Sequence, residues 1–434
     1  MSQDSKTFCV YPWAHQLVLP PGTIGYCCVA KEGGPVLKKD GNRLRVPAAT
    51  LSEAWNSDYQ RDVRKKMLNG ESLSACQLCY YQESIGKNSY RQMHNQEWLE
   101  KERAEIESRI DYSRNHDFAV KDGALYLDLR LGNLCNLKCR MCNPHNSTKI
   151  AAETEGLLKS DVEFKAVYAK YYGEDAVRIP KWYEDQTFWD GIYSQLGSLK
   201  KVYLTGGEPT LIKKNYEFLK KCVDSGHSKH IFLMFNINCT NLTDEFLSYL
   251  EHFEFVLVNA SIDGFKSVNE YIRGSSDWDV VSANFFKLLR AKGPLQIGVT
   301  PTIQVYNVLS ITDLLEYVER VSLEAGKSVN LDFLYVTDPP YLDIRILSPS
   351  IRQIALGKVL AYLAKSSDFV NSNKYLKNSL DSLVNALRST APANMEKLAE
   401  FAQYTKSLDR ARGENFNVSL PVLSHSLASE GICV

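Results

Sequence analysis

The sequence lacks any long hydrophobic run and any excess of charge of one sign. No stretch of its 434 residues approaches the roughly 18 to 20 apolar residues that a membrane-spanning helix needs, so we expect no membrane partner. Lys and Arg number 51, and Asp and Glu number 51, which leaves a formal net charge of zero. This balance argues against a chain that coats nucleic acid by bulk electrostatics, and we expect no nucleic-acid partner.

Other absences narrow the class of protein further. The first residues, MSQDSKTFCVYPW, have neither the basic nor the apolar region of a secretory signal, so we expect a cytoplasmic location. The eight histidines are scattered, and no Ser-His-Asp or H-E-x-x-H arrangement accompanies them. The chain has no internal repeat at solenoid periods and no low-complexity tract. The sequence therefore points to a globular protein without a hydrolase triad or a zincin motif.

What the sequence does contain is eleven cysteines. An odd number without a secretory signal favours a reducing compartment over a disulfide framework. Cys222, Cys239 and Cys433 are isolated, and we interpret them as bystanders. The remaining eight fall into two groups, which are Cys9, Cys27, Cys28, Cys76 and Cys79 near the N-terminus and Cys135, Cys139 and Cys142 within eight positions.

Strand-like and helix-like segments alternate through the middle of the chain. Helical patterns separate most of six predicted strands, which are 125–130, 201–205, 231–238, 253–262, 297–305 and 329–336. Such alternation predicts parallel βαβ units and an α/β fold. Six strands suggest a barrel or partial barrel with loops gathered at the strands' C-terminal ends. Residues 351 to about 408 read as helices that we expect to pack beside the barrel mouth.

The three central cysteines follow the first predicted strand with C-x3-C-x2-C spacing. Thiolates of Cys135, Cys139 and Cys142 can bind three corners of a cubic [4Fe–4S] cluster and leave the fourth iron open to a small ligand. Ordinary electron-transfer clusters have four cysteine ligands, so a missing fourth ligand suggests reactivity. Zinc is the alternative, because Cys3His sites exist and His145 is close in sequence.

With this triplet in the loop after the first strand, the sequence resembles the radical SAM enzymes. The resemblance covers roughly residues 122 to 340 and implies a partial (β/α)6 barrel of the radical SAM type. Met141 stands where the family typically has an aromatic residue before the last cysteine, and a thioether can also pack against a cofactor's apolar face. The family's cofactors are S-adenosyl-L-methionine (SAM) and a [4Fe–4S] cluster that binds SAM at its open iron.

A glycine pair after the second predicted strand strengthens the resemblance. The segment from Thr205 to Pro209, TGGEP, resembles the GGE motif that binds the methionyl amino group of SAM. Two glycines let the backbone approach a ligand closely, and a carboxylate can accept hydrogen bonds from an ammonium group. By this resemblance Gly206, Gly207 and Glu208 bind the cofactor; the alternative reading is a plain turn.

Three further motifs follow the later strands. Asn238 begins an N-C-T-N segment that resembles the family's TNGT-type loop near the cofactor, and Ser261 and Asp263 lie in an S-x-D-G motif that reaches the ribose or methionyl part. Arg273 resembles the arginine that pairs with the SAM carboxylate, a task that suits its planar fork. The alternatives are a strand cap, a turn and a surface arginine.

The N-terminal cysteines resemble the auxiliary-cluster signature of twitch and SPASM domains. Their pattern is C-x12-G-x4-C followed, after a gap, by C-x2-C. The resemblance implies one further [4Fe–4S] cluster bound by Cys9, Cys27, Cys76 and Cys79, with Cys28 able to replace Cys27. The domain precedes the barrel here, whereas the family usually places it after the barrel. A structural zinc ion is the alternative.

The resemblance implies an enzyme that cleaves SAM reductively to a 5′-deoxyadenosyl radical, which abstracts a hydrogen atom from substrate. The expected substrate is a peptide or protein side chain, or a small carbohydrate-like molecule, and the expected reductant is a flavodoxin or ferredoxin. The alternative is a non-catalytic cluster carrier for electron transfer or binding. We predict an auxiliary-cluster domain with a helical linker over 1–121, the core over 122–345 and a C-terminal helical extension over 346–434.

Overall fold

A computed structural model describes residues 6–434, apart from the side chain of Ser367. The chain divides into two compact units. Unit 1 holds the chain up to Asn133, Ile179–Phe235 and His252–Val256, and unit 2 holds Leu134–Arg178, Asn236–Glu251 and Leu257–Val434. None of the helices within residues 6–434 combines the length and the hydropathy required to span a bilayer.

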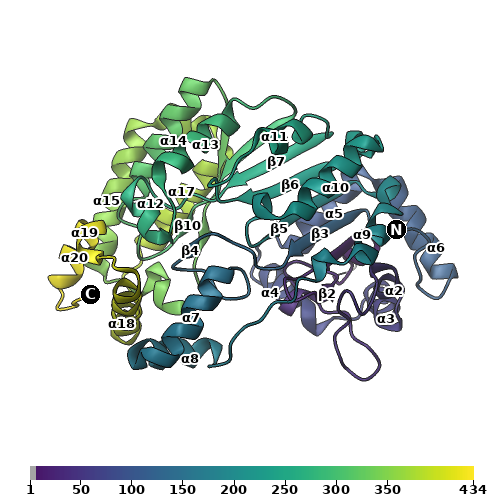
Figure 1. Ribbon diagram of the computed structural model, residues 1–434, viewed down its shortest axis with the longest axis horizontal. Coiled ribbons are helices and arrows are strands. Elements are labelled where there is room, and N and C mark those ends of the chain that lie inside the picture. Colours follow the sequence, from purple (N-terminus) through teal and green to yellow (C-terminus); the bar gives the residue numbers. More distant parts are fainter. Residues whose placement is uncertain (1–5) are drawn as a thin grey trace. The chain divides into compact units, whose positions relative to one another are not determined.

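Unit 1 combines five strands with helices (Figure 1). Its strands are β1 (His15–Val18), β2 (Ile24–Gly25), β3 (Tyr126–Leu131), β5 (Lys201–Gly206) and β6 (Phe232–Ile237), the last of which ends in unit 2. Its α-helices are α1 (Tyr11–Ala14), α2 (Leu51–Trp55), α3 (Asp58–Leu68), α4 (Gln77–Ser84), α5 (Tyr90–Lys101), α6 (Arg103–Asn115), α9 (Gln186–Tyr193) and α10 (Lys213–Asp224). Short 3-10 helices are η1 (Lys31–Gly33), η2 (Ser74–Cys76), η3 (Trp182–Glu184), η4 (Leu196–Ser198), η5 (Pro209–Leu211) and η6 (His227–His230).

The strands of unit 1 form a mostly parallel sheet in the order β2-β1-β3-β5-β6. β1, β5 and β6 join it as parallel strands, and only β2 pairs antiparallel, with β1. The register places His15, Tyr126 and Lys201 side by side. Because neighbouring residues of a register share one face of a sheet, these three side chains lie together, and the His15 and Tyr126 rings are 4.5 Å apart.

Local signals explain the helices of unit 1. Ser89 begins α5 with a capping box, in which its hydroxyl accepts from the Gln92 N–H while the Gln92 side chain accepts from the Ser89 N–H. Helix α10 buries Asn215, Phe218 and Cys222 on one face, which is the three- and four-residue spacing that an amphipathic helix requires. Cys222 is therefore a core residue, as the sequence predicts.

Unit 2 is richer in helix. Its strands are β4 (Lys138–Cys139), β7 (Phe255–Ala260, beginning in unit 1), β8 (Arg273–Gly274), β9 (Leu295–Val299), β10 (Thr302–Ile303), β11 (Val329–Leu331) and β12 (Leu334–Tyr335). Its helices are α7 (Thr148–Ser160), α8 (Val162–Tyr172), α11 (Asp244–Leu250), α12 (Ser267–Ile272), α13 (Trp278–Leu289), α14 (Ile311–Ala325), η7 (Pro340–Leu342), η8 (Ile344–Ile346), α15 (Pro349–Lys365), α16 (Ser367–Ser372), α17 (Lys374–Leu387), α18 (Met395–Arg412), α19 (Phe416–Ser419) and α20 (Pro421–Ala428).

Strands β7, β9 and β11 are neighbours in that order, and β9 pairs parallel with β11. Helix α18 packs against α8, which packs against α7 (Figure 1). Gly413 ends α18 with φ of +65°, a left-handed conformation that favours glycine. The C-terminal helices thus belong to the same compact unit as the cysteine triplet.

The strand predictions are confirmed in place, and the pairs β3–β5, β5–β6 and β9–β11 are parallel as predicted. β3, β5, β6 and β7 occupy the first four predicted segments, and the last two segments each contain two short strands. β1 was not predicted from the sequence. Closure of the strands into a partial barrel and the domain boundaries at 121 and 345 stay predictions, and the first five residues of the predicted N-terminal domain lie outside the described residues.

Candidate functional site

The cysteine triplet lies in one loop of unit 2. Cys139 sits in the short strand β4, where it pairs with Arg273 of β8. The N–H of Cys142 donates to the carbonyl of Cys139 over 3.0 Å, which closes a tight turn between them. Cys139 is buried, while Cys135 and Cys142 are half-buried. The loop therefore carries three thiols on a backbone that hydrogen bonds hold in place.

One predicted cofactor residue, Arg273, contacts the triplet directly, and another, Asp263, contacts it through Arg273. Arg273 Nη1 lies 3.8 Å from Cys139 Sγ, and Arg273 Nε lies 2.8 Å from Asp263 Oδ2. Asp263 is fully buried, and its Oδ1 also accepts from the Thr302 N–H over 2.7 Å. Arg273 thus bridges a carboxylate to a thiol, and a positive charge lies beside a cysteine that has to be a thiolate to bind a metal.

Burial and Arg273 act in opposite directions on these groups. Burial raises the pKa of the Cys139 thiol to about 11, and the Arg273 cation opposes that rise. Burial also raises the pKa of the Cys142 thiol, and the neighbouring Cys139 and Cys135 add to the rise. Burial raises the pKa of Asp263 as well, again against Arg273. Cys139 and Cys142 therefore have to release protons on binding a metal.

Asn238, a further predicted cofactor residue, reaches the loop through hydrogen bonds between amide side chains. Asn238 Nδ2 donates to Asn136 Oδ1 over 3.0 Å, and Asn136 Nδ2 donates to Thr240 Oγ1 over 2.8 Å. Asn136 follows Cys135, so the segment after β6 is tied to the triplet. Ser261 is half-buried, and its N–H donates to the Ile237 carbonyl over 2.7 Å.

The glycine pair lies in unit 1, at the end of β5. Gly206 has φ of +126°, and a Cβ at this position would lie 2.9 Å from the Leu131 nitrogen. Only glycine fits there, because the backbone of the β3 end approaches too closely. Gly207 is half-buried in the bend that follows, and the buried Glu208 accepts hydrogen bonds from the N–H and hydroxyl of Thr210, over 3.2 and 2.6 Å. These contacts give Gly206 and Glu208 structural roles beside the predicted binding role.

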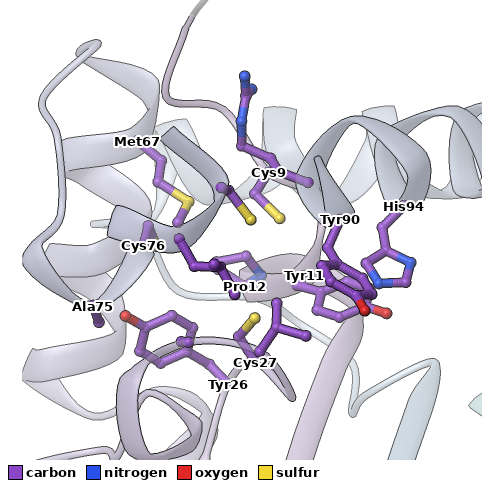
Figure 2. Close-up of a pocket in the computed structure, with 15 residues that line it drawn as sticks. Cys9, Tyr11, Pro12, Tyr26, Cys27, Met67, Ala75, Cys76, Tyr90 and His94 are labelled. Atoms are coloured by element: carbon purple, nitrogen blue, oxygen red, sulfur yellow. The ribbon is translucent and has the colours of Figure 1, made fainter. Parts of the chain in front are cut away.

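The four N-terminal cysteines predicted as ligands line one pocket of unit 1. Figure 2 shows Cys9, Cys27 and Cys76 around this pocket, with Tyr11, Tyr90 and His94 together at one edge; Cys79 also lines it. The four cysteines come from widely spaced parts of the sequence. The fold therefore brings together four thiols that are distant along the chain.

The structure separates the adjacent pair Cys27 and Cys28. Among the described residues that line the pocket, Cys27 is present and Cys28 is not. Cys28 interacts instead with His94: its hydrogen bond with Cys27 and its burial raise the pKa of the Cys28 thiol, while His94 opposes the rise. His94 Nδ1 lies 3.7 Å from Glu97, which pairs with Lys201 Nζ over 2.8 Å. Cys28 is thus a partner of both Cys27 and His94 but is not itself among the described residues that line the pocket.

A buried arginine lies beside the pocket. Arg91 forms a two-pronged ion pair with Glu83, and its Nη1 donates to the Phe8 carbonyl over 2.7 Å, next to Cys9. Burial raises the pKa of the Cys9 thiol to about 12, Cys76 and Cys79 add to the rise, and Arg91 opposes it. As in the triplet, a fixed guanidinium partly offsets the cost of a buried thiolate.

Comparison with known proteins bears on the segment that holds the triplet. Residues 129–321 match the radical SAM superfamily. This match includes Cys135, Cys139 and Cys142 and every cofactor residue predicted from the sequence. It begins after the N-terminal cysteines and ends before the C-terminal helices.

Several solved radical SAM structures are similar to parts of the chain. Native anSMEcpe with bound AdoMet is 17% identical, with 57% of this chain and 62% of that chain covered and a TM-score of 0.35. SuiB from Streptococcus suis bound to precursor peptide SuiA is 13% identical, with 76% and 66% covered and a TM-score of 0.37. The chain spans about three fifths of the length of the anSMEcpe structures. The comparison with curated proteins found no match.

The donor chemistry of the triplet suits the cluster of the radical SAM family. Three thiols share one loop, no fourth cysteine lies in that loop, and Arg273 is placed to stabilise a thiolate. Across residues 6–434, no three His, Cys, Asp or Glu side chains already form a ligand set for a metal ion. The fit of both cysteine groups thus rests on donor type and placement, not on ligand geometry that is already formed.

The N-terminal thiol pocket has the number of donors that a cluster needs, but its cavity is smaller than a cluster. Four thiols match the four ligands of a closed cluster. The cavity has a volume of about 20 Å3, close to the space one water molecule requires. Binding a cluster therefore requires this pocket to widen while its four thiols still face it.

Sequence reasoning missed three residues of these sites. Asn136 and Arg140 lie inside the cysteine loop, so the sequence places them near the triplet. Their contacts could not be predicted, because the residues that they contact come from distant segments. His94 lies on α5, four positions after Tyr90, and both line the pocket. Their spacing of one helical turn was the only sequence signal for it.

Proposed function

We propose that this protein is a radical SAM enzyme. Cys135, Cys139 and Cys142 hold a [4Fe–4S] cluster, and SAM binds at its open iron. A reduced cluster held there would supply the one electron that cleaves SAM to methionine and a 5′-deoxyadenosyl radical, which would abstract a hydrogen atom from substrate. The chain's own residues bind the cofactors, orient them and exclude water.

The observation that carries this proposal is the convergence of separate motifs on the cysteine loop. Arg273 and Asp263 form an ion pair that touches Cys139, and Asn238 is tied to the residue after Cys135. On unit 2, Arg273, Asn238, Ser261 and Asp263 would bind SAM. The role of Gly206, Gly207 and Glu208 in binding its methionyl amino group rests on the resemblance of their motif.

The N-terminal pocket holds a second, closed [4Fe–4S] cluster through Cys9, Cys27, Cys76 and Cys79. Closed ligation favours electron transfer or structural support over direct substrate binding. A flavodoxin or ferredoxin supplies the electron, in the cytoplasm. The substrate is a peptide or protein side chain, or a small carbohydrate-like molecule. In this proposal residues 1–121 form a twitch or SPASM-like domain, 122–345 the radical SAM core and 346–434 a helical extension.

The test is anaerobic reconstitution followed by reduction in the presence of SAM. We expect about eight irons per chain, from two four-iron clusters, and formation of 5′-deoxyadenosine. Replacing all three cysteines of the triplet by Ala should leave about four irons and abolish 5′-deoxyadenosine, because the loop keeps no thiol ligand. Iron analysis and chromatography of the nucleoside measure both outcomes.

Cys222→Ala is the matched control, since Cys222 is a fully buried cysteine in α10 that contributes to neither group. It should keep full iron content and SAM cleavage. Iron binding without any SAM cleavage would favour the non-catalytic cluster carrier. Zinc in place of iron, or cleavage that survives loss of the triplet, contradicts the proposal.

A further inference from the structure

A buried arginine connects the cysteine loop to the C-terminal helices. Arg140 lies between Cys139 and Cys142, and its side chain has no exposed surface. Its Nη2 donates to the carboxylates of Asp409 and Glu414, which lie 269 and 274 residues later in the chain. All of these residues belong to unit 2. The loop that carries the thiols is thus anchored by the end of α18 and the residues after it.

Asp409 is the centre of this anchor. Its carboxylate also accepts from the Tyr271 hydroxyl over 2.8 Å and from the Phe416 N–H over 2.7 Å. Arg140 lies over the Tyr271 ring at 3.6 Å and donates through Nε to the Tyr271 carbonyl over 2.9 Å. Tyr404 of α18 donates to the Arg140 carbonyl over 2.8 Å. Both the side chain and the backbone of Arg140 are therefore held.

A second ionic contact reaches the other side of Cys139. Lys138 Nζ lies 2.9 Å from Glu153 of α7, and Arg412 from the last turn of α18 binds the same carboxylate over 2.6 Å. Arg412 is almost fully buried, and Glu153 is largely buried. The residues before and after Cys139 are thus both linked to the end of α18, one directly and one through Glu153.

The energetics of burial give these pairs a specific consequence. Taking charges out of water is costly, and the attraction within a buried ion pair offsets that cost best where the geometry is good and further hydrogen bonds are made. Arg140 has two carboxylate partners, while its Nη1 has no hydrogen-bond partner among the described residues. Loss of either carboxylate removes one ionic hydrogen bond to Arg140, and the loop is then held less firmly at Cys139 and Cys142, because Arg140 lies between them.

We propose that Asp409 and Glu414 are positioning residues for the cysteine loop, so that the end of α18 controls how firmly the triplet retains its cluster and at what potential the cluster is reduced. The inference deepens the proposed function and rests on it. Its first test needs no metal, which keeps the two separable.

The first experiment measures hydrogen exchange in the full-length, metal-free protein. Asp409→Asn should speed exchange in the segment 134–146, because Arg140 loses a charged partner. The control is Glu400→Gln, since Glu400 is an equally buried carboxylate earlier in α18 that pairs with Lys170 and Lys397 instead. Exchange in α14 shows that each variant is folded. Unchanged exchange in 134–146 for Asp409→Asn overturns the inference.

The second experiment uses the iron-loaded protein. Asp409→Asn and Glu414→Gln should each lose triplet iron to a chelator ~10-fold or more faster than wild type, the usual cost of losing a residue that orients metal ligands. The midpoint potential should become more positive, because loss of an anion beside the cluster favours its reduced, more negative state. Asp409→Glu, which keeps the charge, should restore both readouts.

Glu414→Gln keeps the test decisive if Asp409→Asn does not fold, since Asp409 and its other contacts remain. Iron retention and potential equal to wild type in both variants refute a positioning role while the proposed function stands. A wild-type protein that binds no iron at the triplet refutes the proposed function, and with it the cluster part of this inference.

Discussion

His15 is a neutral histidine buried in β1. From its burial we predict a specific loss of folding stability in mild acid. His15 is fully buried, its Nδ1 lies 3.0 Å from the Tyr26 carbonyl, and its ring stacks on Tyr11 at 4.5 Å. Among the described residues, His15 Nε2 has no hydrogen-bond partner. Burial, together with the nearby charges of His94, Arg130 and Lys201, lowers the pKa of His15 from 6.5 to about 3, while the Tyr26 carbonyl opposes the shift.

The sign and the size of the effect follow from this shift. The folded state binds the proton less readily than the unfolded state, so the contribution of His15 is present above pH 6.5. It is lost progressively as the pH falls toward about 3. At pH 5, which is 1.5 units below the unfolded pKa, the loss is about 2 kcal/mol at 1.36 kcal/mol per unit.

The assay is urea unfolding of wild type and His15→Gln at pH 8 and pH 5, read by hydrogen exchange of segments from β1 and β3. The free energy of unfolding should fall by about 2 kcal/mol less in His15→Gln than in wild type between these pH values. His116→Gln is the control, because His116 also bonds a carbonyl through Nδ1 but is exposed. Equal pH dependence of wild type and His15→Gln would refute the reasoning.

Two further predictions concern the cysteine pocket and the glycine pair. Cys27→Ala should lower the iron content by about four per chain while Cys28→Ala leaves it unchanged, because only Cys27 lines the thiol pocket; equal losses would contradict this assignment. Gly206→Ala should destabilise unit 1 by about 2 to 3 kcal/mol in urea titrations, because alanine is strained at φ of +126° and its Cβ meets the Leu131 backbone; a neutral effect would show that the β3 end can shift.

The fold was predictable where the pattern is local. The six segments from 125 to 336 alternate or run apolar over strand lengths and have helical patterns between most of them, and each contains at least one strand. β1 was missed because HQLV spans only four residues and all four are buried, so it shows no alternation. Its place beside β3 comes from parallel pairing, which no short-range sequence signal specifies.

The thiol pocket shows how far spacing alone can go. The C-x2-C pair and the two upstream cysteines were recognisable as one group, and the structure does line one pocket with them. Spacing favoured Cys27 but left Cys28 as a possible replacement, because the two are neighbours in the chain with the same chemistry. The choice depends on side-chain direction, and His94 on α5, about 65 residues later, provides the polar partner that distinguishes Cys28.

The Arg140 anchor marks the limit of inference from sequence most clearly. Arg140 was visible in the triplet, and an arginine in a loop is ordinarily solvated. Its burial depends on Asp409 and Glu414, which are unremarkable acidic residues at the end of a charged helix. The whole-chain charge of zero does not reveal such pairing, because equal totals of both signs are compatible with separated surface charges.

The contacts of the α18 end depend on four charged side chains within Asp409–Glu414, which pair with the cysteine loop and with residues of α7 and the start of α8. Asp409 and Glu414 pair with Arg140, Arg412 pairs with Glu153, and Arg410 pairs with Asp161. These pairs join α18 to the cysteine loop and to α7, a connection that the sequence pattern of the helix, which predicted only packing beside the barrel mouth, does not specify.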